Sequence, residues 1–130
     1  MWKVFSEITI NKRRARLLAI LWTLLIFFLC FLPARDVPEV NVPLMDKWVH
    51  FILFGVFCFL WLLSFRSFTI RDLFLIFLAS VALGWLVEFF QGLLTFLGRS
   101  RDNMDVLADS IGGLLGIIVF YTTHRLQKKK

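Results

Sequence analysis

Ionisable side chains inside apolar segments are the part of this sequence best suited to chemistry. Asp46 and His50 are four residues apart, so they share one face of a helix. Glu88 lies near the middle of a long apolar run, and Asp105 and Asp109 again have helical spacing. If these runs cross a membrane, each charge costs several kcal/mol and normally faces a protein interior or water. These residues are therefore the first candidates for a functional site.

A histidine near carboxylates suits proton transfer or metal binding. His50 and Glu88 are the candidate catalytic residues, as general acid and base. A set of Asp, Glu and His side chains could also hold a divalent cation through oxygen and imidazole ligands. The sequence pairs no serine or cysteine nucleophile with a base, and it has no metal motif as specific as His-Glu-x-x-His. We therefore predict no cofactor, and a divalent metal remains open.

Structural roles are open for the same residues. Asp46 could cap the helix that follows it, and Asp102 or Asp105 could cap the last helix. Glu88 could hydrogen-bond to a neighbouring helix, and it continues a small and polar stripe along its own helix. Asp109 lies one turn further in, where capping does not explain it. The expected stripe consists of Gly84, Glu88, Gln91, Gly92, Thr95 and Arg99.

The elements that must position these residues are four apolar segments, at about 17–34, 48–65, 73–98 and 105–121. A bilayer core about 30 Å thick needs about 20 apolar residues as helix. Hydrophobic residues make up 59% of the 130 residues, more than a soluble domain of this size could bury. We therefore predict an all-α bundle of four transmembrane helices.

The basic residues predict the orientation of this bundle. Eleven of the fifteen Lys and Arg residues fall in 1–16, 65–72 and 122–130. Because cytoplasmic segments are enriched in Lys and Arg, we expect 1–16 and 122–130 to be a basic cytoplasmic N-terminus and tail. The same explanation of the charge predicts membrane lipid as a partner and no nucleic acid.

Together these expectations place a polar cavity at the outer leaflet. Arg99 and Arg101 could neutralise its carboxylates or hold an incoming anionic group. One difficulty is depth, since a straight helix over 73–98 would place Glu88 about 15 Å inward of residue 98, well below His50. The predicted binding residues are Asp46, Lys47, His50, Glu88, Gln91, Arg99, Arg101, Asp102, Asp105 and Asp109.

Small residues on the last segment predict close helix packing. Ala108, Gly112 and Gly116 form two overlapping small-xxx-small units. Four short helices enclose little volume, so a homo-oligomer is plausible. The face of Gly112 and Gly116 is its candidate interface.

The polar residues of the last three segments form four motifs: Asp46-Lys47-x-x-His50-Phe51-x-x-Phe54, Glu88-x-x-Gln91, Arg99-x-x-Asp102-x-x-Asp105 and Asp109-x-x-Gly112-x-x-x-Gly116. These motifs resemble the VanZ-like family over about residues 44–120. The resemblance implies a small four-helix protein of the bacterial cytoplasmic (inner) membrane. The family is named after a protein linked to low-level resistance to teicoplanin, so the resemblance implies a role in the cell envelope. At the position of Asp109 the family very often has Asn.

Four functions stay open on the sequence alone. The first is envelope protection, including glycopeptide resistance, by binding an amphiphilic or anionic envelope component. The second is an intramembrane enzyme acting on a lipid-linked substrate, and the third is an ion-coupled transporter using Glu88. The last is a structural membrane scaffold, in which the polar residues only join helices.

Overall fold

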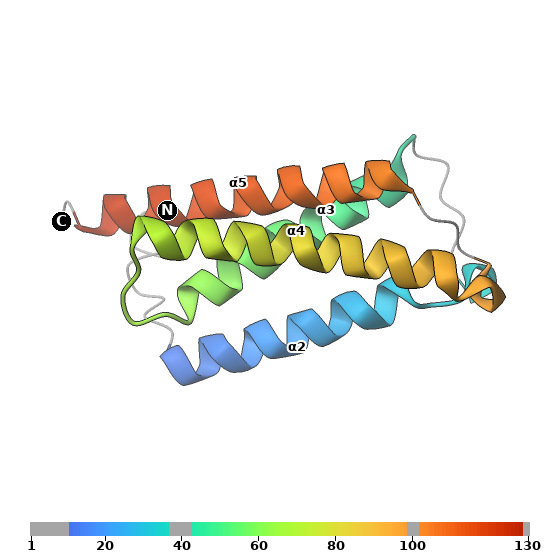
Figure 1. The fold of residues 1–130 in the computed structure, drawn as a ribbon. Helices are drawn as coiled ribbons and strands as arrows, with labels where there is room; N and C mark the ends of the chain where they lie inside the picture. The colour runs from blue at the N-terminus through green and yellow to red at the C-terminus, as the bar shows by residue number, and fades with distance from the viewer. Residues whose placement is uncertain (1–10, 37–42, 99–101, 129–130) are drawn as a thin grey trace.

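The computed structural model describes residues 11–36, 43–98 and 102–128, and these parts of the chain are almost entirely helical (Figure 1). No strand occurs among them, so the predicted all-α class is confirmed. The long helices are α2 (Lys12–Cys30), α3 (Met45–Leu63), α4 (Ile70–Leu93) and α5 (Asn103–Lys128), with short 3-10 helices η1 (Ala34–Asp36) and η2 (Thr95–Leu97).

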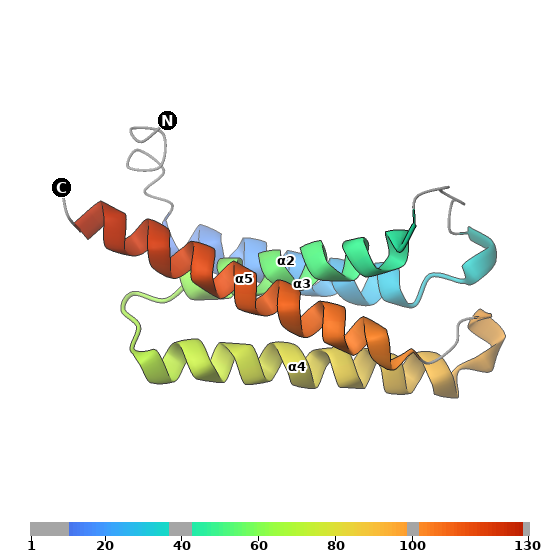
Figure 2. The ribbon, with the colours of Figure 1, turned by 90° about the horizontal axis from the view of Figure 1, so that it is seen from above.

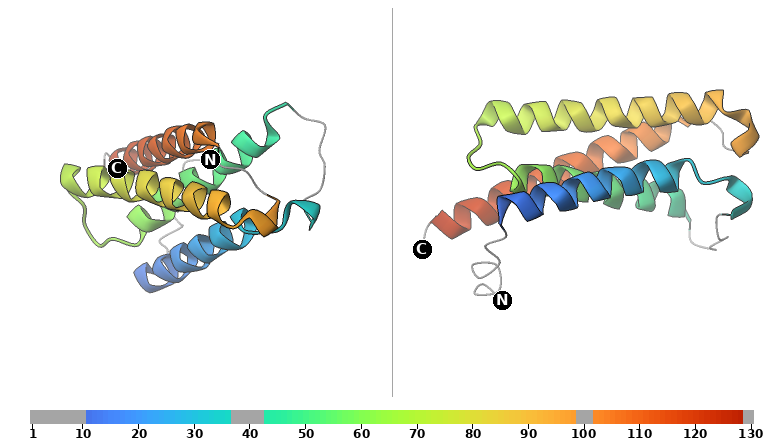
Figure 3. Two further views of the ribbon diagram at one scale, coloured as in Figure 1. Left: turned by 45° about the vertical axis from the view of Figure 1, so that its right-hand side comes forward. Right: turned by 90° about the horizontal axis from the view of Figure 1, so that it is seen from below.

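The four long helices form a bundle in which α3 and α5 make the most extensive contact. Helix α2 packs mainly on α3, and α4 packs mainly on α5. Seen from above and below, α5 crosses obliquely between α4 and α3 (Figures 2 and 3). The start of α2 and the end of α5 lie at one end of the bundle. The starts of α3 and α5 and the end of α4 meet at the other end, which we call the site end (Figure 1).

Glycines bring α3 and α5 into close contact. A Cβ atom added at Gly112 would lie 2.1 Å from the Phe51 carbonyl oxygen, and one at Gly116 would lie 2.1 Å from that of Gly55. Both obstacles are backbone atoms, which cannot move aside as a flexible side chain could. The small-residue face of α5 is therefore filled by α3 of the same chain. Its predicted use as an interface between copies is wrong for this fold.

Helix α2 is joined to its neighbours by polar contacts as well as apolar packing. The Trp22 indole donates to the Leu53 carbonyl at 2.8 Å, and the Trp61 indole donates to the Thr23 hydroxyl at 3.1 Å. The Gln91 amide of α4 donates to the Cys30 carbonyl at 2.6 Å. In lipid, such hydrogen bonds and tight packing hold helices together, because apolar side chains gain little by leaving one apolar medium for another.

Of the aspartates considered as helix caps, Asp46 does not cap its helix and Asp102 does. Helix α3 starts after Leu44, which has a left-handed backbone (φ 58°) and makes no side-chain cap. Asp46 is therefore not the helix cap, and its carboxylate accepts a hydrogen bond from Lys47 instead. Asp102 does act as a cap, since its Oδ1 accepts from the Met104 N–H at 2.9 Å.

Helix α4 ends earlier than the apolar run suggests. Its last residue is Leu93, and the chain continues through η2 to Gly98, whose backbone is left-handed (φ 68°). This glycine conformation turns the chain back towards α5. The expectation of one straight helix over 73–98 is therefore wrong, and Glu88 lies five residues from the end of α4. His50 lies five residues from the start of α3, so the expected mismatch in depth disappears.

Three helices are long and apolar enough to cross a membrane, namely α3, α4 and residues Asn103–Leu126 of α5. Their outer surfaces are apolar, and so is that of α2. Large apolar side chains remain exposed on every long helix, for example Leu24, Ile52, Phe89 and Val119, each more than half exposed. Such outward apolar surfaces suit contact with lipid.

Candidate functional site

Polar side chains from three helices converge at the site end of the bundle. Helix α3 contributes its first turns, α4 its last turns, and α5 its cap and first two turns. Four of the six side chains are buried, and of these His50, Glu88 and Asp109 lie within otherwise apolar helices. We call the group the polar cluster: Lys47, His50, Glu88, Asp102, Asp105 and Asp109.

Lys47 is surrounded by carboxylates in the outer part of the cluster. Its ammonium group donates to Asp46 Oδ2 at 2.7 Å, to Asp102 Oδ2 at 2.5 Å, and to Asp105 Oδ1. An ammonium group has three hydrogens, so these acceptors use its full donor capacity. The same ion pair lowers the pKa of Asp102 below its ordinary value. Lys47 therefore holds α5 to α3 and has no donor left for another anion.

His50 lies deeper, between two carboxylates of α5. Its Nδ1 is 2.7 Å from Asp109 Oδ1, and its Nε2 is 3.7 Å from Asp105 Oδ2. The ring lies parallel to that of Phe54, which limits its rotation. A Cβ atom at residue 84 would lie 2.8 Å from Asp109 Oδ2, so Gly84 makes the room for this carboxylate.

Glu88 reaches the cluster from α4 and is fully buried. Its Oε2 accepts a hydrogen bond from the Asp102 N–H at 2.8 Å, which ties the end of α4 to the start of α5. Its Oε1 has no hydrogen-bond partner within the described part of the chain, and the same holds for Asp109 Oδ2. Unpartnered buried oxygens of this kind are rare, because each costs about 1–3 kcal/mol.

The charges in the cluster do not balance. Four carboxylates belong to it, against the ammonium of Lys47 and the imidazole of His50. Even with a protonated imidazole, two negative charges remain uncompensated in a low-dielectric setting if all the carboxylates are ionised. A proton or a bound cation would reduce this cost.

The cluster contains the two acidic groupings in the described chain that could hold a metal ion. His50, Glu88 and Asp105 each offer one ligand atom, all three atoms lie within 4.8 Å of one another, and all three residues are buried. Asp46, Asp102 and Asp105 have the same spacing, but Asp46 is exposed and Asp102 is partly exposed. The buried grouping combines imidazole nitrogen with carboxylate oxygen.

Comparison with protein families gives one match that covers nearly the whole chain. The family model described as VanZ/LLP1 matches residues 5–124. The chain belongs to the VanZ-like family. Comparisons with curated proteins and with solved structures give no match. Family membership and the three apolar helices agree with a VanZ-like membrane protein. They do not indicate which function it has.

Some residues of the VanZ-like motifs lie away from the cluster. Gln91 points to α2 and binds the Cys30 carbonyl, so in this fold it positions a helix. Gly92 and Thr95 are exposed, because α4 ends at Leu93 and the expected polar stripe ends with it. Arg99 and Arg101 lie outside the described residues. The candidate site is therefore built from the polar cluster alone.

Two structural roles had only a weak signal in the sequence. Lys47 appeared there as one motif residue, and its contact with three carboxylates depends on α5 returning to α3. Gly84 was noted as part of a stripe, but its use is to admit Asp109 from another helix. The sequence signal available for Lys47 was its place directly after Asp46, just before an apolar run (residues 48–65) without Asp, Glu, Lys or Arg.

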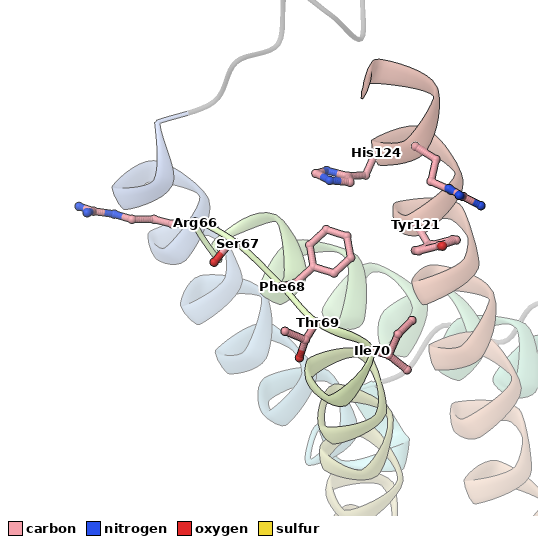
Figure 4. Close-up of a pocket in the computed structure, with 8 residues that line it drawn as sticks. Arg66, Ser67, Phe68, Thr69, Ile70, Tyr121 and His124 are labelled. Carbon is pink, nitrogen blue, oxygen red and sulfur yellow. The ribbon is translucent and has the colours of Figure 1, made fainter. Parts of the chain in front are cut away.

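A concavity with a volume of about 520 Å³ lies at the end of the bundle opposite the polar cluster (Figure 4). Phe68 and His124 meet there with ring centroids 4.6 Å apart, and the Arg125 guanidinium lies over the Tyr121 ring. Arg66 extends away from α5 in this view. In this concavity the Phe68 ring packs on His124 and the Arg125 guanidinium packs on Tyr121. The polar cluster therefore remains the stronger candidate for a functional site.

Proposed function

We propose that this VanZ-like chain is a four-span protein of the bacterial cytoplasmic membrane with both ends inside. The fourth span would be α2, a 19-residue helix with exposed apolar side chains and direct bonds to α3. The proposed direction rests on Lys and Arg residues at the end opposite the polar cluster, where α2 starts and α5 ends. Arg14 lies in the first turn of α2, Arg66 follows α3, and Arg125 lies in the last turns of α5. The cluster would then face the outer leaflet.

We propose further that the polar cluster binds an amphiphilic envelope component and so protects the cell envelope. The observation that carries this proposal is a fully buried Glu88 with one unpartnered oxygen, placed where three helices meet. A network that served only to join helices would be expected to satisfy that oxygen. The outer cavity itself remains a prediction, as does protection against teicoplanin.

The charges restrict which component could bind. Lys47 is saturated by carboxylates, and the cluster carries excess negative charge. An anionic group would therefore need further positive charge at the site. A bound cation, or an amine carried by the ligand, would provide it.

Antibiotic susceptibility tests the proposal. A sensitive Gram-positive host would express the wild-type chain, Glu88→Gln or the control Asp36→Asn, which alters an exposed acid in η1. We expect the wild type and the control to raise the inhibitory concentration of teicoplanin more than that of vancomycin. Glu88→Gln should lose this effect at an equal level in the membrane. Equal protection by Glu88→Gln would refute the proposal, and a parallel loss of protein would favour the scaffold.

An intramembrane enzyme acting on a lipid-linked substrate is the second candidate. The position of His50 between Asp105 and Asp109 favours it, since carboxylates on both sides of an imidazole can orient it for proton transfer. This candidate predicts turnover of a lipid-linked phosphate by purified protein in liposomes. The turnover should be lost in His50→Gln.

A further inference from the structure

We infer that the polar cluster binds one divalent transition-metal cation through His50, Glu88 and Asp105. The inference deepens the proposed function and rests on it for its biological meaning, because the cation would supply the positive charge that Lys47 cannot. It concerns three side chains from α3, α4 and α5, so the ion would join three of the four long helices.

The geometry of the three side chains favours an ion between them. One ligand atom from each lies within 4.8 Å of the others. A tetrahedral zinc ion with ligands at about 2.0–2.2 Å holds the ligand atoms about 3.3–3.6 Å from one another. Side-chain rotations that bring these atoms closer together by up to about 1.5 Å would therefore close the site.

His50 is already arranged as a metal ligand with a supporting carboxylate. Its Nδ1 contacts Asp109 Oδ1 at 2.7 Å, so with Nδ1 protonated the ring donates to Asp109. The lone pair then lies on Nε2, the atom that faces Asp105. Histidine ligands commonly donate their other N–H to a carboxylate, which fixes the ring and increases its basicity. Asp109 would be this positioning residue.

An independent observation points to a ligand at the same place. Glu88 is fully buried, yet its Oε1 has no hydrogen-bond partner within the described residues. Glu88 also belongs to the buried grouping with His50 and Asp105. An ion would provide the missing partner. With His50 neutral as a ligand, three negative charges of the cluster are uncompensated, and a divalent ion would compensate two of them.

The ligand chemistry selects the class of cation. Imidazole favours zinc and other transition metals over Mg²⁺ and Ca²⁺, which prefer oxygen ligands only. Three protein ligands leave a further position on the ion for an oxygen from outside. A phosphate or carboxylate group of an envelope lipid would fit that position.

Metal binding by the purified full-length chain in detergent tests the inference. Protein freed of metal with a chelator would be dialysed against Zn²⁺, and bound metal would be counted by mass spectrometry. Titration with Mn²⁺, followed by electron paramagnetic resonance, would give affinities. We expect one ion per wild-type chain and at least tenfold weaker binding in both Glu88→Gln and His50→Gln. Asp46→Asn, which removes a carboxylate only from the exposed grouping, should bind as the wild type does.

A second measurement separates loss of the site from loss of the fold. Binding to the folded state alone stabilises it, so saturating Zn²⁺ should raise the Tm of the wild type and of Asp46→Asn. It should leave the Tm of Glu88→Gln unchanged. If Glu88→Gln does not fold, Glu88→Asp keeps the charge, shortens the reach and should show weaker binding.

Three results would overturn the inference. They are a wild-type chain that binds no ion, equal binding in Glu88→Gln, and loss of binding in Asp46→Asn alone. None of these measurements involves an antibiotic. A chain that binds metal but gives no protection would therefore refute the proposed function and leave the metal site standing. Protection by a chain that binds no metal would refute the metal site and leave the proposed function standing.

Discussion

At the scale of single residues, the polar cluster is notable for how differently its carboxylates are treated. Asp102 and Asp105 share the ammonium of Lys47, whereas Asp109 has one oxygen at His50 and one oxygen with no partner in the described chain. Glu88 is in the same situation as Asp109. The two unpartnered oxygens are deep in the cluster. Substitutions at these residues should therefore distinguish the effect of the negative charge on stability from the effect of side-chain size.

Asp109→Asn should keep the fold. The amide oxygen can still accept from the His50 N–H, and the substitution removes one buried charge. Asp109→Leu leaves that N–H without a partner, and it should lower the free energy of unfolding by about 1–3 kcal/mol. Thermal unfolding of both variants in the same detergent checks this. Equal destabilisation by Asn and Leu would show that the charge itself is required.

Asp102→Asn should reveal the ion pair with Lys47 through pH. The pKa of Asp102 is below its ordinary value of 3.8 in the folded state, so ionisation favours folding. This stabilisation is complete above the ordinary value and is lost as pH falls through the folded pKa. We therefore expect the wild type to have the higher Tm at pH 7 and this difference to shrink below about pH 4.

The amide at residue 102 can still accept from the Met104 N–H, so the variant changes charge and leaves the helix cap in place. High salt should reduce the difference at pH 7, because the pair is partly exposed. A Tm difference of the same size at pH 7 and at pH 3 would contradict an electrostatic origin.

At the scale of helices, the contact between α3 and α5 determines how the two sets of site residues face each other. Gly112 and Gly116 let the backbones approach directly, with no side chain between them. Lys47 and His50 on α3 are thereby brought close to Asp105 and Asp109 on α5. The glycines therefore position the site although they lie outside it.

Gly116→Ala should separate these helices. Its Cβ would meet the Gly55 carbonyl oxygen at 2.1 Å, which forces a backbone shift. Overpacking of this kind costs about 1–3 kcal/mol or more. Gly92→Ala is the matched control, since Gly92 is exposed on α4 and alanine favours a helix. Thermal unfolding would compare the two, and equal stability would show that α5 can move without cost.

Much of this arrangement could be predicted from the sequence, and the reason differs between elements. Long apolar runs predicted the helices, because hydropathy and length report directly on spans. The spacing of Gly112 and Gly116 predicted close packing, but spacing does not name the partner, and α3 takes the place expected for a second copy. The end of α4 at Leu93 was missed, because Leu94, Phe96 and Leu97 continue the apolar run after the helix stops.

The sequence indicated which residues could gather at one site more readily than which of them would contact one another. The predicted convergence of His50, Glu88 and Asp109 depended on helical spacing within each segment. Gln91 has the same spacing but binds α2, since a stripe on a helix can face more than one neighbour. Contacts across helices, such as those of Lys47, depend on crossing geometry that one sequence does not state.

At the scale of the whole molecule, the two ends of the bundle differ in chemical character. Carboxylates gather at the site end, and the start of α2 and the end of α5 lie at the other end with basic residues. The proposed orientation puts the first end outside the cell. This difference between the ends can be measured directly.

Alkaline phosphatase fusions should report this orientation, because the enzyme is active only outside the cytoplasm. Fusions after Asp36 and after Gly98 should be active, and fusions after Arg66 and at the C-terminus should be inactive. Green fluorescent protein at the same four places should give the opposite pattern. Activity after Arg66 or at the C-terminus would contradict the proposed direction.

Gly84 has a consequence for how chains of this fold can vary between species. It lies on α4, and the carboxylate that needs its missing side chain lies on α5, held in place by His50. Any larger residue at position 84 would collide with Asp109 unless that side chain became shorter. We expect the two positions to change together during divergence, so a lineage that gains a side chain at position 84 should carry a shorter side chain at position 109.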